Sequence, residues 1–186
     1  MTKLDPRRQP FREDVAAESL RGVVDAWRYV QGDRQQVAAS AVPLRREPLT
    51  GANLDTEALH GETLVVFDEQ DGWAWVQLDH DGYVGYVPSE GLGPVRPPAT
   101  HRIAALRTYV FSEPDAKAPP LRMLSLNARV CVAEVGARYA QLACGGFIYA
   151  SHVGPIGRLA PDFVAIAEGF LGSPYLWGGR TSVGLD

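Results

Sequence analysis

The chain has 186 residues, a formal net charge of −4 and 46% hydrophobic residues. This length can bury a core and allows roughly one to three small domains. The basic residues are scattered, so we expect no nucleic-acid partner, because contacts with phosphates rely on clustered lysine and arginine. No apolar run is long enough to span a bilayer, and the N-terminus lacks the apolar stretch of a secretory signal. We therefore expect no membrane partner and a cytoplasmic location.

The two cysteines, Cys131 and Cys144, are too few for a disulfide framework, although a bond between them stays open. Cys131 lies in an alternating run and is interpreted as a small, buried or half-buried hydrophobic residue. Neither cysteine has a base nearby in sequence or sits at a helix start, so neither is expected to be catalytic. We expect no metal site and no cofactor, because the spacing of the four histidines builds none. These are His60, His80, His101 and His152, interpreted as surface or turn residues.

The first 36 residues form a lead-in segment whose structure the sequence leaves open. Residues 15–30 fit either a helix or an extended segment, and Gly22 weakens the helical alternative.

A three-stranded meander is predicted after the lead-in segment. Side chains alternate in character over 64–67, 73–78 and 83–87, and Asp-Gly pairs at 71–72 and 81–82 are turn signals between these runs. The middle run carries two tryptophans on one face. They are expected to cover the barrel or a neighbouring domain, and stacking on a sugar or peptide is the alternative.

The same pattern of alternating runs separated by turn residues recurs later in the chain and indicates an internal duplication. Three further strands are predicted between residues 129 and 150, and Tyr86 falls on Tyr149 when the copies are overlaid. Residues 93–100, rich in proline, are typical of a stiff linker. Two small, partly open β-barrels in tandem are the expected architecture.

An amphipathic helix of about ten residues is predicted from residue 161, because apolar residues follow i, i+3, i+4 and i+7 spacing. Pro161 fits the first helical position, and Gly172 can end the helix in the left-handed conformation.

The C-terminal stretch SPYLWGGRTSVGLD, residues 173–186, resembles the opening of the NlpC-type cysteine peptidase domain. In that papain-like family a Tyr-x-Trp-Gly-Gly motif and a later Asp lead directly into Cys-Ser-Gly, whose cysteine is the nucleophile. Tandem bacterial SH3-like modules before such a domain resemble the subgroup that cuts cell-wall peptides between γ-D-glutamate and the following diamino acid.

The resemblance implies a mainly β chain with two tandem SH3-like barrels, followed by the first helix and motif loop of a truncated α+β papain-like domain. The lead-in covers residues 1–36 and the barrels cover 37–95 and 99–157. The start of the peptidase domain covers 160–186.

The resemblance also implies which residues contact the substrate. Tyr175 matches a family tyrosine thought to lie near the scissile carbonyl, with core packing as the alternative, and Trp177 is expected in the core. Glu47 and Tyr83, together with Asp186, are the expected ligands of the substrate's free α-amine. An ammonium withdrawn from water needs opposed negative charge and hydrogen-bond acceptors. A solvated glutamate and a sheet-packing tyrosine are the alternatives. The expected partner is a murein-derived peptide with a free N-terminus.

The family's nucleophile would follow Asp186 directly and its base would come later, so the 186-residue chain is expected to be inactive by itself. The leading hypothesis is the N-terminal part of a γ-D-glutamyl-L-diamino acid endopeptidase of peptidoglycan recycling. One alternative is a non-enzymatic tandem SH3-like module that binds peptides or cell-wall fragments or docks a partner. Another is an enzyme of two chains.

Truncation of the peptidase domain would leave apolar side chains of its first helix and motif without cover. We expect them to form an exposed patch that contacts the missing remainder of the domain or promotes self-association. The patch consists of Phe163, Ile166, Phe170, Tyr175 and Trp177.

Overall fold

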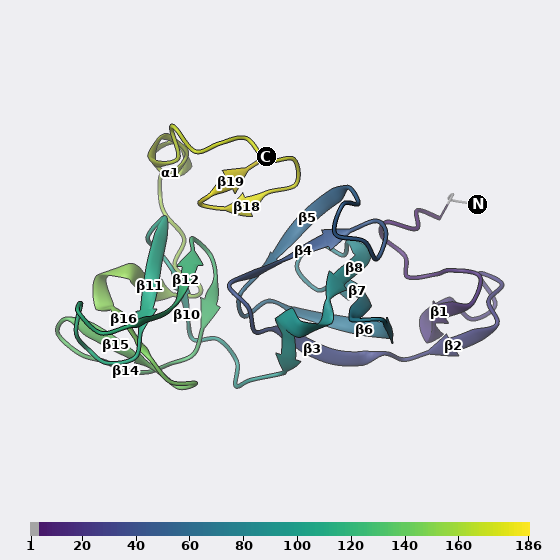
Figure 1. The fold of residues 1–186 in the computed structure, drawn as a ribbon, viewed down its shortest axis with the longest axis horizontal. Coiled ribbons are helices and arrows are strands. Elements are labelled where there is room, and N and C mark those ends of the chain that lie inside the picture. Colours follow the sequence, from purple (N-terminus) through teal and green to yellow (C-terminus); the bar gives the residue numbers. More distant parts are fainter. Residues whose placement is uncertain (1–3) are drawn as a thin grey trace. The chain divides into compact units, whose positions relative to one another are not determined.

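The computed structural model describes residues 4–186 and is mainly β, as predicted (Figure 1). The described residues divide into two compact units. Residues 4–58 and 62–95 form the first unit, and residues 59–61 and 96–186 form the second. No helix in this part of the chain has the length and apolar character that crossing a bilayer requires.

Seven strands of the first unit form one sheet in the order β5-β4-β8-β7-β6-β3-β9. They are β3 (Asp33–Val37), β4 (Ala41–Arg45), β5 (Leu54–Leu59), β6 (Thr63–Gln70), β7 (Trp73–Leu78), β8 (Val84–Pro88) and β9 (Leu92–Pro94), with the 3-10 helix η2 (Ser89–Gly91) after β8. The predicted meander is confirmed as β6, β7 and β8. Asp71 and Gly72 have φ of 51° and 79°, and positive φ at both positions is the requirement of a type I′ hairpin turn.

The N-terminal segment is extended rather than helical, which decides the alternative that the sequence left open. β1 (Val15–Ala17) pairs in parallel with β2 (Arg28–Val30), and η1 (Glu18–Leu20) is a single 3-10 turn between them. Short strands of this length do not bury a core of their own. The segment is stabilised by packing against the sheet of the first unit.

Two apolar clusters hold the first unit together, one on each face of β7. Ala74 and Val76 belong to the inner cluster with Leu64, whereas Trp75 packs in an outer cluster with Val15 of the N-terminal segment. Alternation along a strand sends successive side chains to opposite faces, so one strand serves both clusters. The covering role predicted for the tryptophan pair is confirmed at Trp75, which is 4% exposed.

The second unit contains a five-stranded sheet in the order β12-β11-β16-β15-β14, a three-stranded sheet β13-β10-β17 and the pair β18-β19. The strands are β10 (His101–Ile103), β11 (Arg107–Phe111), β12 (Pro120–Ser125), β13 (Arg129–Val130), β14 (Val132–Val135), β15 (Tyr139–Leu142), β16 (Phe147–Tyr149), β17 (Val153–Pro155), β18 (Arg180–Thr181) and β19 (Gly184–Leu185), with η3 (Ala150–His152) after β16. In both units a strand is followed by a 3-10 turn and another short strand. Cys131 is half-buried, Cys144 is exposed, and both are free thiols.

The predicted helix is α1 (Phe163–Gly169), which is shorter than expected and begins later. The Asp162 side chain accepts hydrogen bonds from the backbone N–H groups of Val164 and Ala165, at 2.9 and 3.1 Å. Asp162 is therefore the N-cap, and Pro161 lies outside the helix rather than at its first position. Gly172 has φ of 85° but lies in the turn beyond the helix end.

Apolar side chains of α1 and the motif are exposed. Phe163, Tyr175 and Trp177 are 82%, 68% and 63% exposed, while Ile166 and Phe170 are half-buried. The expectation that Trp177 lies in the core is wrong, because the described part of the second unit places no element over this side of the motif. Ser182 fixes the segment to β12: its backbone N–H donates to Ser125 Oγ at 3.1 Å.

Candidate functional site

A β-bulge in β6 brings two consecutive side chains to the outer face of the first unit. Val66 lies opposite Val76, but Asp68 lies opposite Trp75, so Phe67 is the extra residue. A bulge of this kind re-aims the side chains that follow it. Phe67 joins the outer cluster, and Asp68 points to the N-terminal segment instead of the inner cluster.

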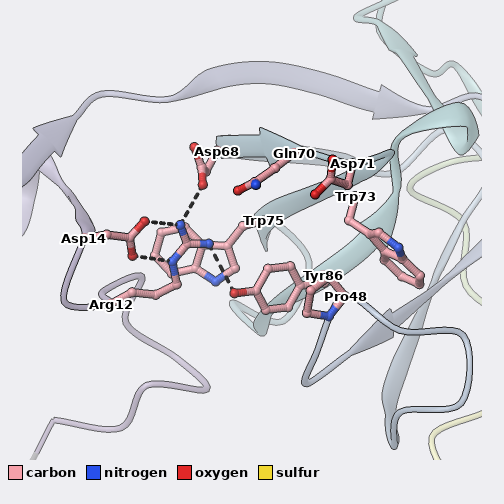
Figure 2. Close-up of a pocket in the computed structure, with 9 residues that line it drawn as sticks. All are labelled: Arg12, Asp14, Pro48, Asp68, Gln70, Asp71, Trp73, Trp75 and Tyr86. Atoms are coloured by element: carbon pink, nitrogen blue, oxygen red, sulfur yellow. Dashed lines mark hydrogen bonds and ion pairs between the residues drawn. The ribbon is translucent and has the colours of Figure 1, made fainter.

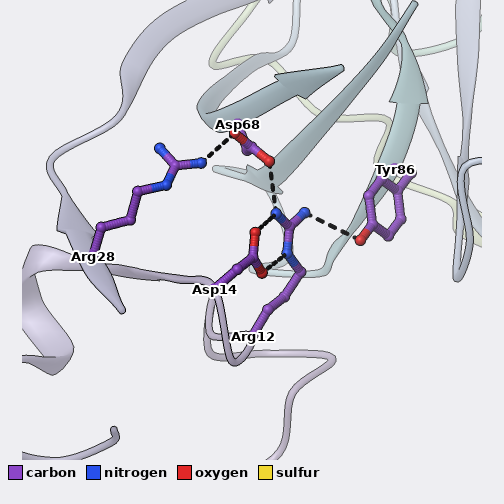
Figure 3. A network of polar contacts seen from close by, with 5 residues as sticks. All are labelled: Arg12, Asp14, Arg28, Asp68 and Tyr86. Atoms are coloured by element: carbon purple, nitrogen blue, oxygen red, sulfur yellow. Dashed lines mark hydrogen bonds and ion pairs between the residues drawn. The ribbon is translucent and has the colours of Figure 1, made fainter. Parts of the chain in front are cut away.

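Arg12 of the N-terminal segment is the centre of a polar network on this outer face (Figure 3). It binds Asp14 through two hydrogen bonds of 2.8 and 2.6 Å, and Asp68 through one of 2.6 Å. It also donates to the Tyr86 hydroxyl at 3.2 Å. The guanidinium carbon lies 4.5 Å from the centre of the Trp75 ring, within range of a cation–π interaction.

The ionisation of these groups follows from their contacts. Burial opposes the charge of Arg12, but hydrogen bonds to Asp14 and Asp68 outweigh it and raise the pKa of the guanidinium. Burial also opposes the charge of Asp68, yet hydrogen bonds from Arg12 and Arg28 hold the pKa of its carboxyl below 3.8. Arg28 donates to Asp68 at 2.5 Å. Arg12 and Asp68 are therefore both charged at neutral pH.

A cavity of about 360 Å³ opens beside the network and is called the acidic cavity below (Figure 2). Three carboxylates and one guanidinium line it, together with an amide, three aromatic rings and a proline. The lining residues are Arg12, Asp14, Pro48, Asp68, Gln70, Asp71, Trp73, Trp75 and Tyr86. Aromatic walls with a few convergent polar groups are typical of small-ligand sites.

A second cavity of about 260 Å³ shares Arg12, Trp75 and Tyr86 with the first and is called the basic cavity below. Its charged lining has the opposite sign, with three guanidinium groups and one carboxylate. The lining residues are Pro6, Arg7, Phe11, Arg12, Arg46, Asp55, Trp75, Val84, Gly85 and Tyr86. The N-terminal segment thus completes both cavities.

Glu47 and Tyr83, the substrate-binding residues predicted in the first unit, lie in different surroundings. Glu47 is exposed in the β4–β5 connection, next to Pro48 of the acidic cavity. Tyr83 is half-buried against the inner cluster, and Arg8 lies 5.0 Å from the centre of its ring. Tyr83 lines neither of the two cavities described, whereas Tyr86, three residues later, lines both.

Tyr175 and Asp186, the site residues predicted in the second unit, lie close to each other. Tyr175 forms a bridge with Leu185, and Asp186 accepts a hydrogen bond from the backbone N–H of Gly178 at 2.9 Å. The hydrogen bond between the Tyr175 hydroxyl and the Asp186 carboxylate raises the pKa of the phenol, because a phenolate beside a carboxylate is disfavoured. Gly178, with φ of 71°, supplies the turn that this geometry needs.

Sequence reasoning missed Arg12, Asp68 and Tyr86 as members of a site. Arg12 and Asp68 are separated by 56 residues, so no local pattern connects them. A charged residue directly after the apolar run Leu64–Phe67 was the available signal, and it indicates only a strand end. Across residues 4–186, no group of three or more metal-binding side chains comes together.

Part of the chain is similar in sequence to known bacterial peptidases. Residues 44–92 match the family model of the bacterial dipeptidyl-peptidase SH3 domain. Over 146 residues, 72% of its length, the chain is 25% identical to the gamma-D-glutamyl-L-lysine dipeptidyl-peptidase of Bacillus subtilis (strain 168). The chain spans about half, 49%, of that relative.

The fold agrees with this similarity. A crystal structure of an NlpC/P60 family protein from Bacillus cereus ATCC 10987 matches with a TM-score of 0.67 at 17% identity, covering 83% of this chain and 68% of that protein. The chain is thus homologous to a bacterial dipeptidyl-peptidase and shares the fold of an NlpC/P60 protein. The resemblance found in the sequence is confirmed.

Proposed function

We propose that the whole protein is a cysteine peptidase that hydrolyses the bond between γ-D-glutamate and a diamino acid in murein-derived peptides, in cytoplasmic recycling of peptidoglycan. In this proposal the 186 residues contain two SH3-like modules and the opening of the papain-like domain. The nucleophile and the base come from sequence that follows Asp186 in the whole protein. Similarity to the Bacillus subtilis dipeptidyl-peptidase supports the choice of substrate.

The observation that carries the proposal is the geometry of the motif loop. The Asp186 carboxylate holds both the Tyr175 hydroxyl and the Gly178 N–H, so a phenol is fixed beside the position where the nucleophile would follow. The neutral phenol has one O–H donor, which it gives to Asp186 here and would turn toward the oxygen of the scissile carbonyl when the substrate binds. Tyr175 would therefore stabilise the charge that develops on that oxygen.

The reaction would be acyl transfer through a cysteine–histidine pair. The thiolate attacks the carbonyl carbon of the γ-amide, and the diamino acid leaves as an amine after receiving a proton from the histidine. Water then hydrolyses the thioester and releases the γ-carboxylate of glutamate.

Glu47, Tyr83 and Asp186 remain our proposed ligands for the free α-amine of the substrate. The carboxylates of the acidic cavity support Glu47 alone among these, because the neighbouring Pro48 lines that cavity, whereas Tyr83 lines neither cavity. Opposed negative charge is what a desolvated ammonium requires. A requirement for a free N-terminus would restrict the enzyme to released fragments.

The test is hydrolysis of L-Ala-γ-D-Glu-L-Lys by the whole protein, with release of lysine followed by mass spectrometry. The whole protein is expected to cleave the peptide, and Tyr175→Phe is expected to lower kcat about 100-fold or more, as loss of one oxyanion donor does. Phe163→Leu, on an exposed residue of α1, is the control. Release of lysine by the 186-residue chain alone would contradict the assignment of the nucleophile.

A non-enzymatic binding module is the second candidate, and the two cavities of the first unit favour it. It predicts that the whole protein binds the tripeptide but leaves it intact. The same assay, combined with calorimetry, therefore separates the two functions.

A further inference from the structure

Ser182 is a buried residue at the tip of the β18–β19 hairpin. Thr181 pairs with Gly184, so Ser182 and Val183 form the two-residue loop between the strands. Residues of such a loop lie outside the ladder and usually face solvent. Val183 does so and is 55% exposed, but Ser182 is only 3% exposed. The tip of the hairpin is therefore held against another part of the second unit.

A cross-strand pair of β11 and β12 receives Ser182. Arg107 and Ser125 lie opposite each other in these strands. The Ser182 N–H donates to Ser125 Oγ at 3.1 Å, and the two hydroxyl oxygens lie 3.3 Å apart. Arg107 Nη1 donates to the Ser182 carbonyl at 3.4 Å. Because a buried N–H without an acceptor is costly, Ser125 specifies where the loop lies.

The contact at Ser182 stands beside a cavity rather than within a packed interface. A cavity of about 340 Å³ is lined by Leu106 and Arg107 on the strand side, and by residues 169–174, Ser182 and Val183 on the other side. Residues 169–174 are the end of α1 and the turn after it. Tight packing therefore does not fix the motif segment here, and the hydrogen bonds of Ser182 take that role.

The hairpin passes its position on to the motif loop through backbone hydrogen bonds. The Leu185 N–H donates to the Pro174 carbonyl at 3.1 Å, and the Asp186 N–H donates to the Gly179 carbonyl at 3.1 Å. The Asp186 carboxylate in turn accepts a hydrogen bond from the Tyr175 hydroxyl. A shift of the hairpin tip would therefore reach the phenol.

We propose that Ser125 is a positioning residue for the candidate site of the second unit. By binding Ser182 it fixes the β18–β19 hairpin, and the hairpin holds Asp186 against Tyr175. The consequence for catalysis rests on the proposed function, in which the Tyr175 phenol stabilises the charge on the scissile carbonyl oxygen. Strand β12 would then contribute to catalysis without touching the substrate.

The first readout is the pKa of Tyr175 in the 186-residue chain, measured by NMR with tyrosine isotope-labelled at Cζ. The hydrogen bond to Asp186 raises this pKa. Ser125→Ala removes the hydroxyl that holds the hairpin, so the Tyr175 pKa should fall toward 10.0. Ser125→Thr keeps a hydroxyl and should retain the raised pKa. A merely structural role of Ser125 would lower the unfolding midpoint and leave the pKa in the folded chain unchanged.

Thr108→Val is the matched control. Thr108 is 4% exposed, and its hydroxyl bonds His152 Nδ1 at 2.8 Å instead of the hairpin. The control should therefore destabilise the unit but leave the Tyr175 pKa raised. Arg107→Gln decides the question if Ser125→Ala does not fold. Because Arg107 is exposed, this variant removes one contact with the hairpin without opening the core, and it should lower the same pKa by a smaller amount.

The second readout is hydrolysis of L-Ala-γ-D-Glu-L-Lys by the whole protein. Ser125→Ala should lower kcat/KM about tenfold or more, since a displacement of about 1 Å in a catalytic group can cost about 100-fold. Ser125→Thr should restore most of the activity.

An unchanged Tyr175 pKa in both Ser125→Ala and Arg107→Gln overturns the inference, as does an equal fall in Thr108→Val. Wild-type kcat/KM in Ser125→Ala overturns the positioning role in catalysis. Failure of the proposed function is a separate result: the Tyr175 pKa would still respond to Ser125→Ala, but the whole protein would leave the peptide intact.

Discussion

The two units differ in what covers the aromatic side chains on the outer face of their sheets. In the first unit the N-terminal segment covers Trp75, and Arg12 bonds the Tyr86 hydroxyl. In the second unit Tyr149, which the sequence overlay places on Tyr86, instead stacks on Tyr139 with ring centres 4.9 Å apart. Tyr109 stays 50% exposed on the same unit. The cavities of the first unit are thus a product of the added segment and not of the sheet alone.

Trp75→Ala is expected to have the largest effect among the variants that test this difference. We expect a loss of about 3 to 4 kcal/mol in the free energy of unfolding of the first unit, because a large buried ring leaves a cavity. Tyr109→Ala, on the exposed face of the second unit, should cost less than about 1 kcal/mol. Urea unfolding, followed by amide NMR signals of each unit, measures both. Similar losses would show that the N-terminal segment does not bury the first aromatic face.

Arg12→Ala should cost the first unit about 2 kcal/mol, since it leaves Asp14 and Asp68 without their shared partner. The counterpart in the second unit is Arg138→Ala. Arg138 lies over the rings of Tyr139 and Tyr149 at 5.6 and 5.9 Å but is exposed, so we expect at most about 0.5 kcal/mol. The same unfolding experiment compares them, and an Arg138 variant as damaging as the Arg12 variant would refute the contrast.

Acid should weaken the first unit before the second. Arginine hydrogen bonds hold the pKa of Asp14 and Asp68 below 3.8 in the folded chain. Their stabilisation is therefore complete above about pH 4 and is lost as the pH falls through the folded-state values. Amide hydrogen exchange at pH 6 and pH 3 should show the change in the first unit, and Asp68→Asn should reduce it. An equal change in both units contradicts the prediction.

The smallest expected effect is a titration shift in the second unit. Asp186→Asn should return the pKa of Tyr175 toward 10.0, because the variant lacks the charged hydrogen-bond acceptor that raises this pKa. Ultraviolet titration of the phenol, in a background with the other tyrosines replaced by phenylalanine, measures this. Asp162→Asn removes the same charge at the cap of α1 and serves as control. An unchanged Tyr175 pKa in Asp186→Asn would show that the carboxylate does not hold the phenol.

Local patterns in the sequence predicted the local structure well. The Asp-Gly turns and the alternation around them placed β6, β7 and β8, because a hairpin depends on neighbouring residues. The start of α1 was misplaced, since the side chain of Asp162 decides it and Pro161 fits either side of a helix start. The arginine network could not be predicted, because it joins segments that no period relates. The family motif singled out Tyr175 and Asp186, but it did not predict the hydrogen bond between them.

The bulge at Phe67 has an evolutionary consequence. Because of the extra residue, β6 directs both Phe67 and Asp68 to the outer face, where Phe67 joins the outer cluster and Asp68 binds Arg12. Deletion of one codon at this point would leave a single side chain opposite Trp75, so β6 would lose either the ring in the outer cluster or one of the two carboxylates that bind Arg12. A single inserted residue thus gives one strand both an apolar and a charged contact with the N-terminal segment, which is a short evolutionary step.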